Sequence, residues 1–114
     1  MVRKYVPDRG DIVWIDLDPT VGREQNGRRP ALVLSSRLVN NKSGLALMCP
    51  ITSSRKGYPF EIPMVGETIS GVILTDHVRS IDWTSRYLSF AERIDPDVLK
   101  IVQSYIVALV AGED

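Results

Sequence analysis

The chain has 114 residues, of which 44% are hydrophobic and 25% charged, ordinary values for one globular domain. Fourteen basic residues balance fourteen acidic ones, which excludes adhesion to nucleic acid or membranes through overall charge. One cysteine excludes an internal disulfide, no apolar run approaches the roughly 20 residues that span a bilayer, and the N-terminus lacks the apolar stretch of a secretory signal. We therefore expect a single domain over residues 1–114, without a membrane segment, in the reducing cytoplasm.

Short strands separated by turn residues fill most of the chain. Residues 11–18 alternate in polarity, with Val13, Ile15 and Leu17 on one face. Pro50 lies inside the apolar run 44–52, which implies an edge position or a bulge. Many short strands at regular spacing favour a small barrel or sandwich. In chain order, the expected strands are 11–18, 31–36, 44–52, 58–63, 71–76, 78–83 and 86–93.

The C-terminal segment changes to a helical period. Asp95 is suited to cap a helix, Pro96 to occupy its first position and Gly112 to close it. One apolar stripe recurs at helical spacing: Val98, Leu99, Val102, Ile106 and Leu109. We expect this stripe to pack against the sheet, and a role in a dimer interface stays open beside that interpretation.

The basic residues are unevenly distributed. Residues 23–56 contain seven of them against one acid, Glu24, so this segment carries a net charge of +6 and the remainder −6. Such a segment in a neutral protein favours a local anionic ligand, although clustered arginines also spread apart on folding. The expected long loops, 20–29, 39–44 and 53–58, hold most of these charges, and loops on a β scaffold commonly carry binding groups.

Several chemistries are excluded by the residue types. One histidine and one cysteine, with no carboxylate cluster, give no metal site. A phosphate-binding P-loop and the Gly-x-Ser-x-Gly elbow of serine hydrolases are both missing. Cys49 is expected in the core, and His77 as a structural or peripheral binding residue.

The remaining inventory suits metal-free cleavage of RNA by its own 2′-OH. This reaction needs a base for that hydroxyl, a donor for the leaving oxygen, and cations for the developing phosphorane charge. Arg29 is a candidate for the cation, Thr52 for a hydroxyl donor, and Glu24 for a base or for orienting an arginine. Residue types alone leave Arg29 equally open to a structural role, such as pairing with Asp16.

Three segments resemble the MazF/PemK family of type II toxin endoribonucleases, and the resemblance covers nearly the whole chain. They are "RGDIVWIDLDPTVGREQNGRRPALVLS" (Arg9–Ser35), "PITSSRKGYPFE" (Pro50–Glu61) and "GVILTDHVRSIDW" (Gly71–Trp83). The ordered set of Asp-Pro, Gly-x-Glu-Gln-x-Gly, Arg-Pro and Pro-x-Thr is specific in combination, although each piece is weak alone.

The resemblance implies a mainly β fold with helices (α+β), a small SH3-like or CcdB-like barrel with a C-terminal helix, forming a homodimer. It implies cleavage of single-stranded RNA, mostly mRNA, without a cofactor or metal, leaving 2′,3′-cyclic phosphate and 5′-hydroxyl ends. The family's catalytic residues correspond to Arg29, Thr52 and Glu24. The implied partner is a MazE/PemI-like antitoxin, whose acidic tail would block the RNA groove.

Further residues are expected to contact RNA. Arg23 and His77 depart from the family pattern near the expected groove, so base preference is expected to differ rather than activity. The expected RNA contacts are Gln25, Arg28, Asn40, Lys56, Asp76, His77, Arg79 and Arg86.

Two alternatives belong to other classes. A CcdB-like toxin binds DNA gyrase through a Trp-Gly-Ile terminus, whereas this chain ends in "VALVAGED". A non-catalytic RNA-binding barrel would show salt-dependent RNA binding without a cleavage product.

Overall fold

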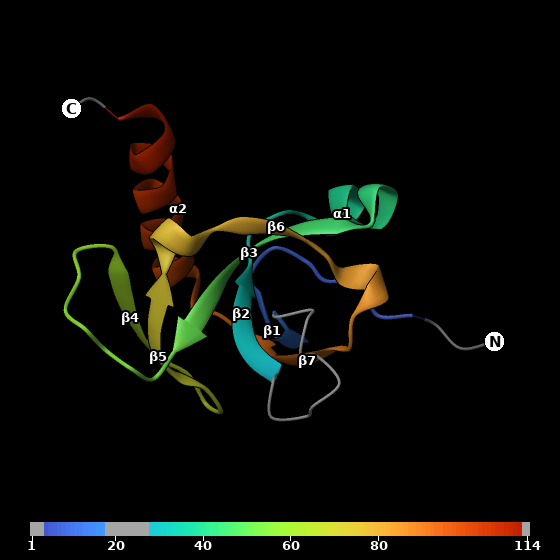
Figure 1. The fold of residues 1–114 in the computed structure, drawn as a ribbon, viewed down its shortest axis with the longest axis horizontal. Coiled ribbons are helices and arrows are strands. Elements are labelled where there is room, and N and C mark those ends of the chain that lie inside the picture. Colours follow the sequence, from blue (N-terminus) through green and yellow to red (C-terminus); the bar gives the residue numbers. More distant parts are fainter. Residues whose placement is uncertain (1–3, 18–27, 113–114) are drawn as a thin grey trace.

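The computed structural model describes residues 4–17 and 28–112, and antiparallel strands make up most of them (Figure 1). The sheet follows the order β4-β5-β3-β2-β1-β7, and β6 pairs with β3 beside this path. The sheet curls, and helix α2 (Pro96–Ala111) follows its last strand, so the predicted mainly β fold with a C-terminal helix is confirmed. The strands are β1 (Asp11–Asp16), β2 (Arg28–Val33), β3 (Leu45–Thr52), β4 (Glu61–Val65), β5 (Ser70–Leu74), β6 (Arg79–Asp82) and β7 (Leu88–Arg93).

Strand β3 is shared between two parts of the sheet. One edge pairs with β2, and the other pairs with β6 through Met48↔Arg79 and then with β5 from Ile51↔Ile73 onward. On β3, two residues lie between Met48 and Ile51, whereas five residues lie between their partners Ile73 and Arg79. The three additional residues form the 3-10 helix η2 (Thr75–His77), which bulges out of the ladder beside Pro50. The predicted irregularity at Pro50 is confirmed, because a residue without an N–H occupies the break in pairing.

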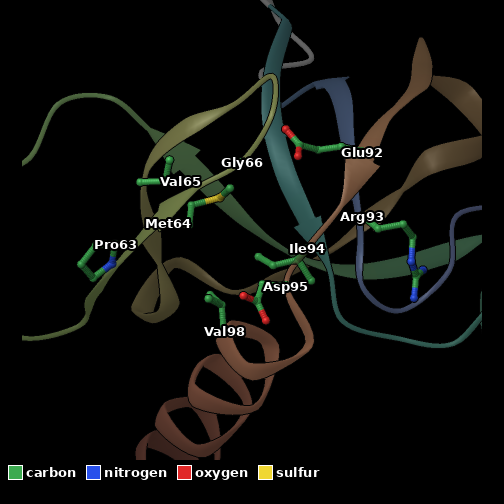
Figure 2. Close-up of a pocket in the computed structure, with 9 residues that line it drawn as sticks. All are labelled: Pro63, Met64, Val65, Gly66, Glu92, Arg93, Ile94, Asp95 and Val98. Carbon is green, nitrogen blue, oxygen red and sulfur yellow. The ribbon is translucent and has the colours of Figure 1, made fainter.

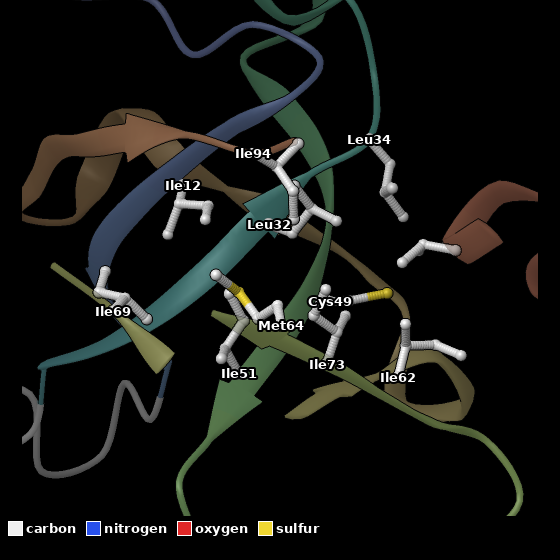
Figure 3. Packing of buried hydrophobic residues seen from close by; sticks show 11 residues of the cluster. Ile12, Leu32, Leu34, Cys49, Ile51, Ile62, Met64, Ile69, Ile73 and Ile94 are labelled. Atoms are coloured by element: carbon white, nitrogen blue, oxygen red, sulfur yellow. The ribbon is translucent and has the colours of Figure 1, made fainter. Parts of the chain in front are cut away.

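Both faces of the β1–β2–β3 layer are buried. Alternate residues point to opposite sides, so Ile12 and Leu32 belong to one cluster, whereas Val13 and Val33 belong to the other. The first cluster, drawn in Figure 3, includes the buried Cys49 and extends to residues of β4 and β5 and to Val102 of α2. The second cluster lies on the other face and includes Met48, Ile81 and Trp83.

Helix α2 begins and packs as the sequence predicts. The Asp95 carboxylate accepts a hydrogen bond from the Asp97 N–H at 2.9 Å, and Pro96 is the first helical residue. The N–H of Gly112 closes the far end on the Ala108 carbonyl. Most of the expected stripe packs against the first cluster, although Leu109 remains 41% exposed. The packed members are Val98, Leu99, Val102 and Ile106.

Two expected loops contain regular structure. Residues 39–44 lie largely in helix α1 (Arg37–Ser43), where the Ser36 hydroxyl caps the start and Gly44, at φ 75°, ends it. The expected loop 20–29 ends earlier than predicted, because Arg28 and Arg29 already pair with Asp16 and Ile15 in the β1–β2 ladder. None of the helices in the described ranges is long and apolar enough to cross a membrane.

Candidate functional site

Antiparallel pairing gathers several of the predicted residues at one end of the sheet. Strands β1 and β3 finish there, while β2 and β7 begin there, and β6 sends the side chain of Arg79 toward it. We call this region the arginine end. It carries Arg28 and Arg29 on β2, Thr52 on β3, Arg79 on β6, and Arg86 just before β7.

Arg29 and Thr52 occupy corresponding positions on neighbouring strands. The β2–β3 ladder stops at Ala31↔Pro50, where β3 moves over to pair with β5. Continuing the same register by two residues would bring Arg29 opposite Thr52, and alternation gives both side chains the same face of the sheet. The pair therefore lies where the two strands separate, with Arg29 exposed and Thr52 half-buried.

The hydroxyl of Thr52 is oriented by its own loop. Its Oγ1 accepts a hydrogen bond from the N–H of Ser54 at 3.1 Å. A hydroxyl that accepts this bond keeps its proton for donation to another acceptor. Thr52 is thus suited to donate a hydrogen bond to an anionic group held by Arg29.

Gly71 supports Thr52 from the adjacent strand, a contact that the sequence analysis missed. Gly71 has φ 155°, and a Cβ atom built on it would lie 2.3 Å from the Thr52 carbonyl oxygen. Contacts under 3.0 Å essentially never occur for real Cβ atoms, so only glycine fits beside this strand end. The signal in the sequence was a glycine at the start of an apolar strand.

Arg28 reaches across β1 from the other face. Its Nη2 donates to the Ser89 hydroxyl on β7 at 2.5 Å. Its Nε is buried and has no hydrogen-bond partner in the part of the chain that the structure describes. A buried guanidinium N–H is costly to leave unpaired, so Arg28 retains capacity for a further acceptor.

Arg79 and Arg86 both bond to the end of β1. The Arg86 Nη1 donates to the Asp16 carbonyl at 2.5 Å, and its Nε donates to the Asp82 carbonyl at 3.2 Å. The Arg79 Nη2 donates to the next carbonyl, that of Leu17. Two predicted RNA contacts therefore have backbone partners within the protein.

Lys56, Asp76 and His77 border this region without contacting its centre. Lys56 follows Thr52 in the loop before β4, and its backbone N–H donates to the Glu61 carboxylate at 3.1 Å. Asp76 and His77 lie in the η2 bulge, with 3.9 Å between the carboxylate and the imidazole Nε2, and both are exposed. Burial, together with the Asp76 charge, raises the pKa of Cys49 to about 12, which suits the predicted core role of this thiol.

Asn40 does not belong to this region. It lies in α1, between the end of β2 and the start of β3, at the opposite end of the sheet. Its side chain is fully buried and donates to the carbonyls of Pro7 and Ser35 at 2.8 and 2.9 Å. The Ser35 hydroxyl also donates to its Oδ1 at 2.6 Å. Burial and these bonds argue against the predicted RNA contact, and give Asn40 a structural role.

Three residues of the sequence analysis lie outside the described residues. They are Arg23, Glu24 and Gln25, within the segment 18–27 that joins β1 to β2. Among the residues that are described, no three histidines, cysteines or carboxylates come together as metal ligands.

A pocket of about 260 Å³ lies away from the arginine end, between β4, the end of β7 and the start of α2 (Figure 2). Its charged groups are engaged in the fold. The Glu92 carboxylate accepts hydrogen bonds from the N–H groups of Glu67, Thr68 and Ile69 at 2.8–2.9 Å. Burial raises the pKa of Glu92, but these backbone bonds outweigh it and bring the pKa below its ordinary value. Arg93 pairs with the buried Asp11 at 2.7 Å.

The arginine end has the chemistry of an anion site. Guanidinium groups bind phosphate in a bidentate manner and stay charged at every physiological pH. A hydroxyl beside them adds a donor to the same phosphoryl group. Strand ends that carry guanidinium groups suit a chain-like ligand such as a single-stranded nucleic acid.

A family described as the PemK-like, MazF-like toxin of type II toxin–antitoxin systems matches residues 8–110. The "Endoribonuclease toxin MazF" of Escherichia coli K12 is 46% identical over 110 residues, covering 96% of this chain and 99% of that protein. "Endoribonuclease PemK" of Escherichia coli is 32% identical over 105 residues, covering 88% and 79% respectively. A crystal structure of MazE–MazF from Deinococcus radiodurans has a TM-score of 0.85 at 41% identity, covering 96% of this chain and 100% of that one.

Proposed function

Because the chain belongs to the PemK-like, MazF-like family of type II toxin–antitoxin toxins, we propose that it is an endoribonuclease toxin that cuts single-stranded RNA, chiefly mRNA, and so arrests translation and growth. Relatives from Escherichia coli that carry the name endoribonuclease support this activity. The observation that carries the proposal is the position of Arg29 and Thr52 at the arginine end. Both continue the β2–β3 register on one face, beyond its last pair, and we propose that they contact the same phosphate.

In the proposed reaction, the 2′-oxygen of the RNA attacks the adjacent phosphorus. A P–O2′ bond forms and the P–O5′ bond breaks, leaving a 2′,3′-cyclic phosphate and a 5′-hydroxyl. Arg29 stabilises the charge that develops on the non-bridging oxygens, and Thr52 donates a hydrogen bond to the same group. Glu24 is proposed to take the 2′-proton or to orient Arg29, in which case the 2′-proton passes to solvent. The departing 5′-oxygen takes up a proton from solvent to give the 5′-hydroxyl. The reaction requires no metal, because the guanidinium supplies the positive charge.

The proposal includes three statements about the protein's surroundings. The partner is a MazE-like antitoxin, which the MazE–MazF structure of Deinococcus radiodurans supports, and an acidic segment of this antitoxin is proposed to cover the arginine end. The toxin acts as a homodimer, and α2 leaves an apolar outer face exposed for a second copy, including Ile101, Tyr105 and Val110. The site of action is the cytoplasm, where mRNA is translated.

A cleavage assay in EDTA tests this function. Purified wild-type protein should cut a long single-stranded RNA at short sequences, and end analysis should show cyclic phosphate and 5′-hydroxyl termini. Arg29→Ala should slow cleavage about 10²–10³-fold, equivalent to roughly 3–4 kcal/mol, because one preorganised charge-stabilising donor is lost. Arg37→Ala is the matched control, since Arg37 is an exposed arginine at the opposite end of the sheet.

Two outcomes contradict the proposal. If Arg29→Ala folds and cuts at the wild-type rate, the role of Arg29 is wrong. If wild-type protein binds RNA but yields no cyclic-phosphate product in EDTA, the metal-free reaction is wrong. No observation here favours the gyrase-binding alternative, and incubation with gyrase and supercoiled DNA should give no poisoned complex.

A further inference from the structure

We infer that Arg79 and Arg86 are positioning residues that fix the end of β1 and, through it, the start of β2 that carries Arg29. This inference rests on the proposed function for its kinetic consequence, but the anchoring itself is a property of the fold. It replaces a role limited to RNA contact, which was the expectation from sequence.

The arginine bonds reach the end of β1 where its ladder with β7 stops. Its last pair with β7 is Ile15↔Leu88, and its last pair with β2 is Asp16↔Arg28. The carbonyls of Asp16 and Leu17 therefore lie at or beyond the limit of the β7 ladder. Arg86 donates a hydrogen bond to the Asp16 carbonyl and Arg79 donates one to the Leu17 carbonyl. These guanidinium groups therefore supply side-chain hydrogen-bond donors where the β7 backbone no longer pairs.

The two arginines approach from different elements. Arg86 also donates through Nε to the Asp82 carbonyl, so one planar guanidinium joins the end of β6 to the end of β1. Arg79 extends from the start of β6, where it pairs with Met48 of β3. The end of β1 is consequently tied to strands with which it shares no backbone ladder. Bonds from charged donors are among the stronger hydrogen bonds in proteins.

Fixing β1 also fixes the residues opposite it. Ile15 faces Arg29 and Asp16 faces Arg28 in the β1–β2 register. Arg28 in turn bonds across β1 to Ser89 of β7. A shift in the Asp16 peptide would therefore move the backbone from which the Arg29 side chain projects. Displacements of about 1 Å in a catalytic group can reduce a rate on the order of 100-fold.

A lysine at position 86 would keep the charge but lose the geometry. The guanidinium has five N–H donors in a rigid plane, which lets Arg86 bond two carbonyls at once. An ammonium on a flexible stem is a point charge without that fork. Restoration of activity by lysine would therefore indicate a contact that needs only positive charge, whereas failure to restore it would indicate an anchor that needs the planar guanidinium.

The experiment compares Arg86→Ala, Arg86→Lys, Arg79→Ala and Arg79→Lys with the wild type and with Arg37→Ala. The substrate is an RNA whose cut site has been mapped on the wild type, and its 2′-O-methyl analogue at that site measures binding without cleavage. Anchoring predicts that both alanine variants lower kcat about 10–100-fold with KM nearly unchanged. It also predicts that Arg86→Lys fails to restore kcat, while the salt dependence of binding stays that of the wild type in all four variants.

A phosphate contact predicts the opposite pattern and would overturn the inference. Binding would weaken, the slope of log affinity against log salt would fall by about 0.7 per lost contact, and lysine would restore most of the affinity. Urea unfolding checks that each variant is folded, and the lysine variants serve if an alanine variant is not.

Hydrogen exchange tests the anchor without reference to RNA. Peptides covering residues 11–16 and 28–33 should exchange faster in Arg86→Ala and Arg79→Ala, and at the wild-type rate in Arg37→Ala. Unchanged protection in the two alanine variants would refute the anchoring. If the wild type cuts no RNA at all, the proposed function fails, and the exchange result alone still decides whether these arginines hold β1.

Discussion

Replacing Gly71 by alanine should impair catalysis while leaving the protein folded. The new methyl group would meet the Thr52 carbonyl oxygen at 2.3 Å and the Thr52 carbonyl carbon at 2.9 Å. The contacted Thr52 atoms belong to the backbone of a paired strand, so a side-chain rotation cannot relieve the clash. The Thr52 end of β3 must move until the methyl–oxygen contact reaches at least 3.0 Å, a separation of about 0.7 Å.

This displacement determines how much stability and how much kcat the Gly71→Ala variant should lose. Overpacking costs about 1–3 kcal/mol, and the φ of 155° at Gly71 adds about 1–3 kcal/mol of backbone strain for alanine. The sum is about 2–6 kcal/mol, below the stability of all but the least stable domains at roughly 5–15 kcal/mol, so we expect most molecules to remain folded. If the Thr52 hydroxyl has the proposed catalytic role, its displacement by about 0.7 Å should reduce kcat about 10–100-fold.

Single-turnover cleavage of a mapped RNA, together with urea unfolding, measures the two effects separately. Gly44→Ala is the matched control, because Gly44 also has a positive φ of 75° but its added Cβ would lie an ordinary 3.6 Å from Thr84. It ends α1, away from the arginine end, and should lose about 1–2 kcal/mol of stability with no change in kcat. If Gly71→Ala is destabilised but cleaves at the wild-type rate, the steric link from Gly71 to Thr52 is refuted.

Three other predictions concern the scaffold. Glu92→Gln should lower the free energy of unfolding by about 1.5–3 kcal/mol, because an amide cannot accept all the bonds from the three N–H groups of the β4–β5 turn. The pKa of Glu92 is lowered in the folded protein, so the ionised carboxylate stabilises the fold above its ordinary pKa of 4.5, and this stabilisation is lost as the pH falls through the folded pKa. Urea titrations at pH 7 and in acid should therefore show that the difference in the free energy of unfolding between wild type and Glu92→Gln becomes smaller in acid. Asn40→Ala should cost about 2–4 kcal/mol in urea unfolding and leave RNA affinity unchanged, and a selective loss of affinity would restore the RNA contact expected from sequence. Cys49 should resist iodoacetamide at pH 8 in the native protein and react readily in urea, as its buried site and pKa of about 12 imply.

The sequence predicted what local pattern encodes. Alternating polarity located the strands, and the capping residues Asp95 and Pro96 located the start of α2. Helix α1 was missed, although Ser36 before it and Gly44 after it are ordinary helix-ending signals. Seven residues show too little periodicity to stand out, and the helix is held by tertiary bonds to Asn40.

The sequence proposes the members of the candidate site, but it does not predict how the described members are arranged. Arg29 and Thr52 were identified from residue types and from the family resemblance, and their shared face follows from the β2–β3 register. The bonds of Arg79 and Arg86 to β1 join residues 62 and 70 positions apart, which no local pattern encodes. The steric role of Gly71 depends on β3 leaving β2 for β5, which is a property of the assembled sheet.

The double-sided burial of the β1–β2–β3 layer limits where this protein can change in evolution. Neighbouring residues of β2, such as Ala31, Leu32 and Val33, are all fully buried, whereas Arg29 at the start of the strand is exposed. A substituted side chain inside the layer must fit the packing of the cluster on its own face, and most substitutions would destabilise the fold. Tolerated variation is therefore concentrated at strand ends and in the loops. New RNA sequence preferences can arise there without rebuilding the core, whereas the core itself evolves slowly.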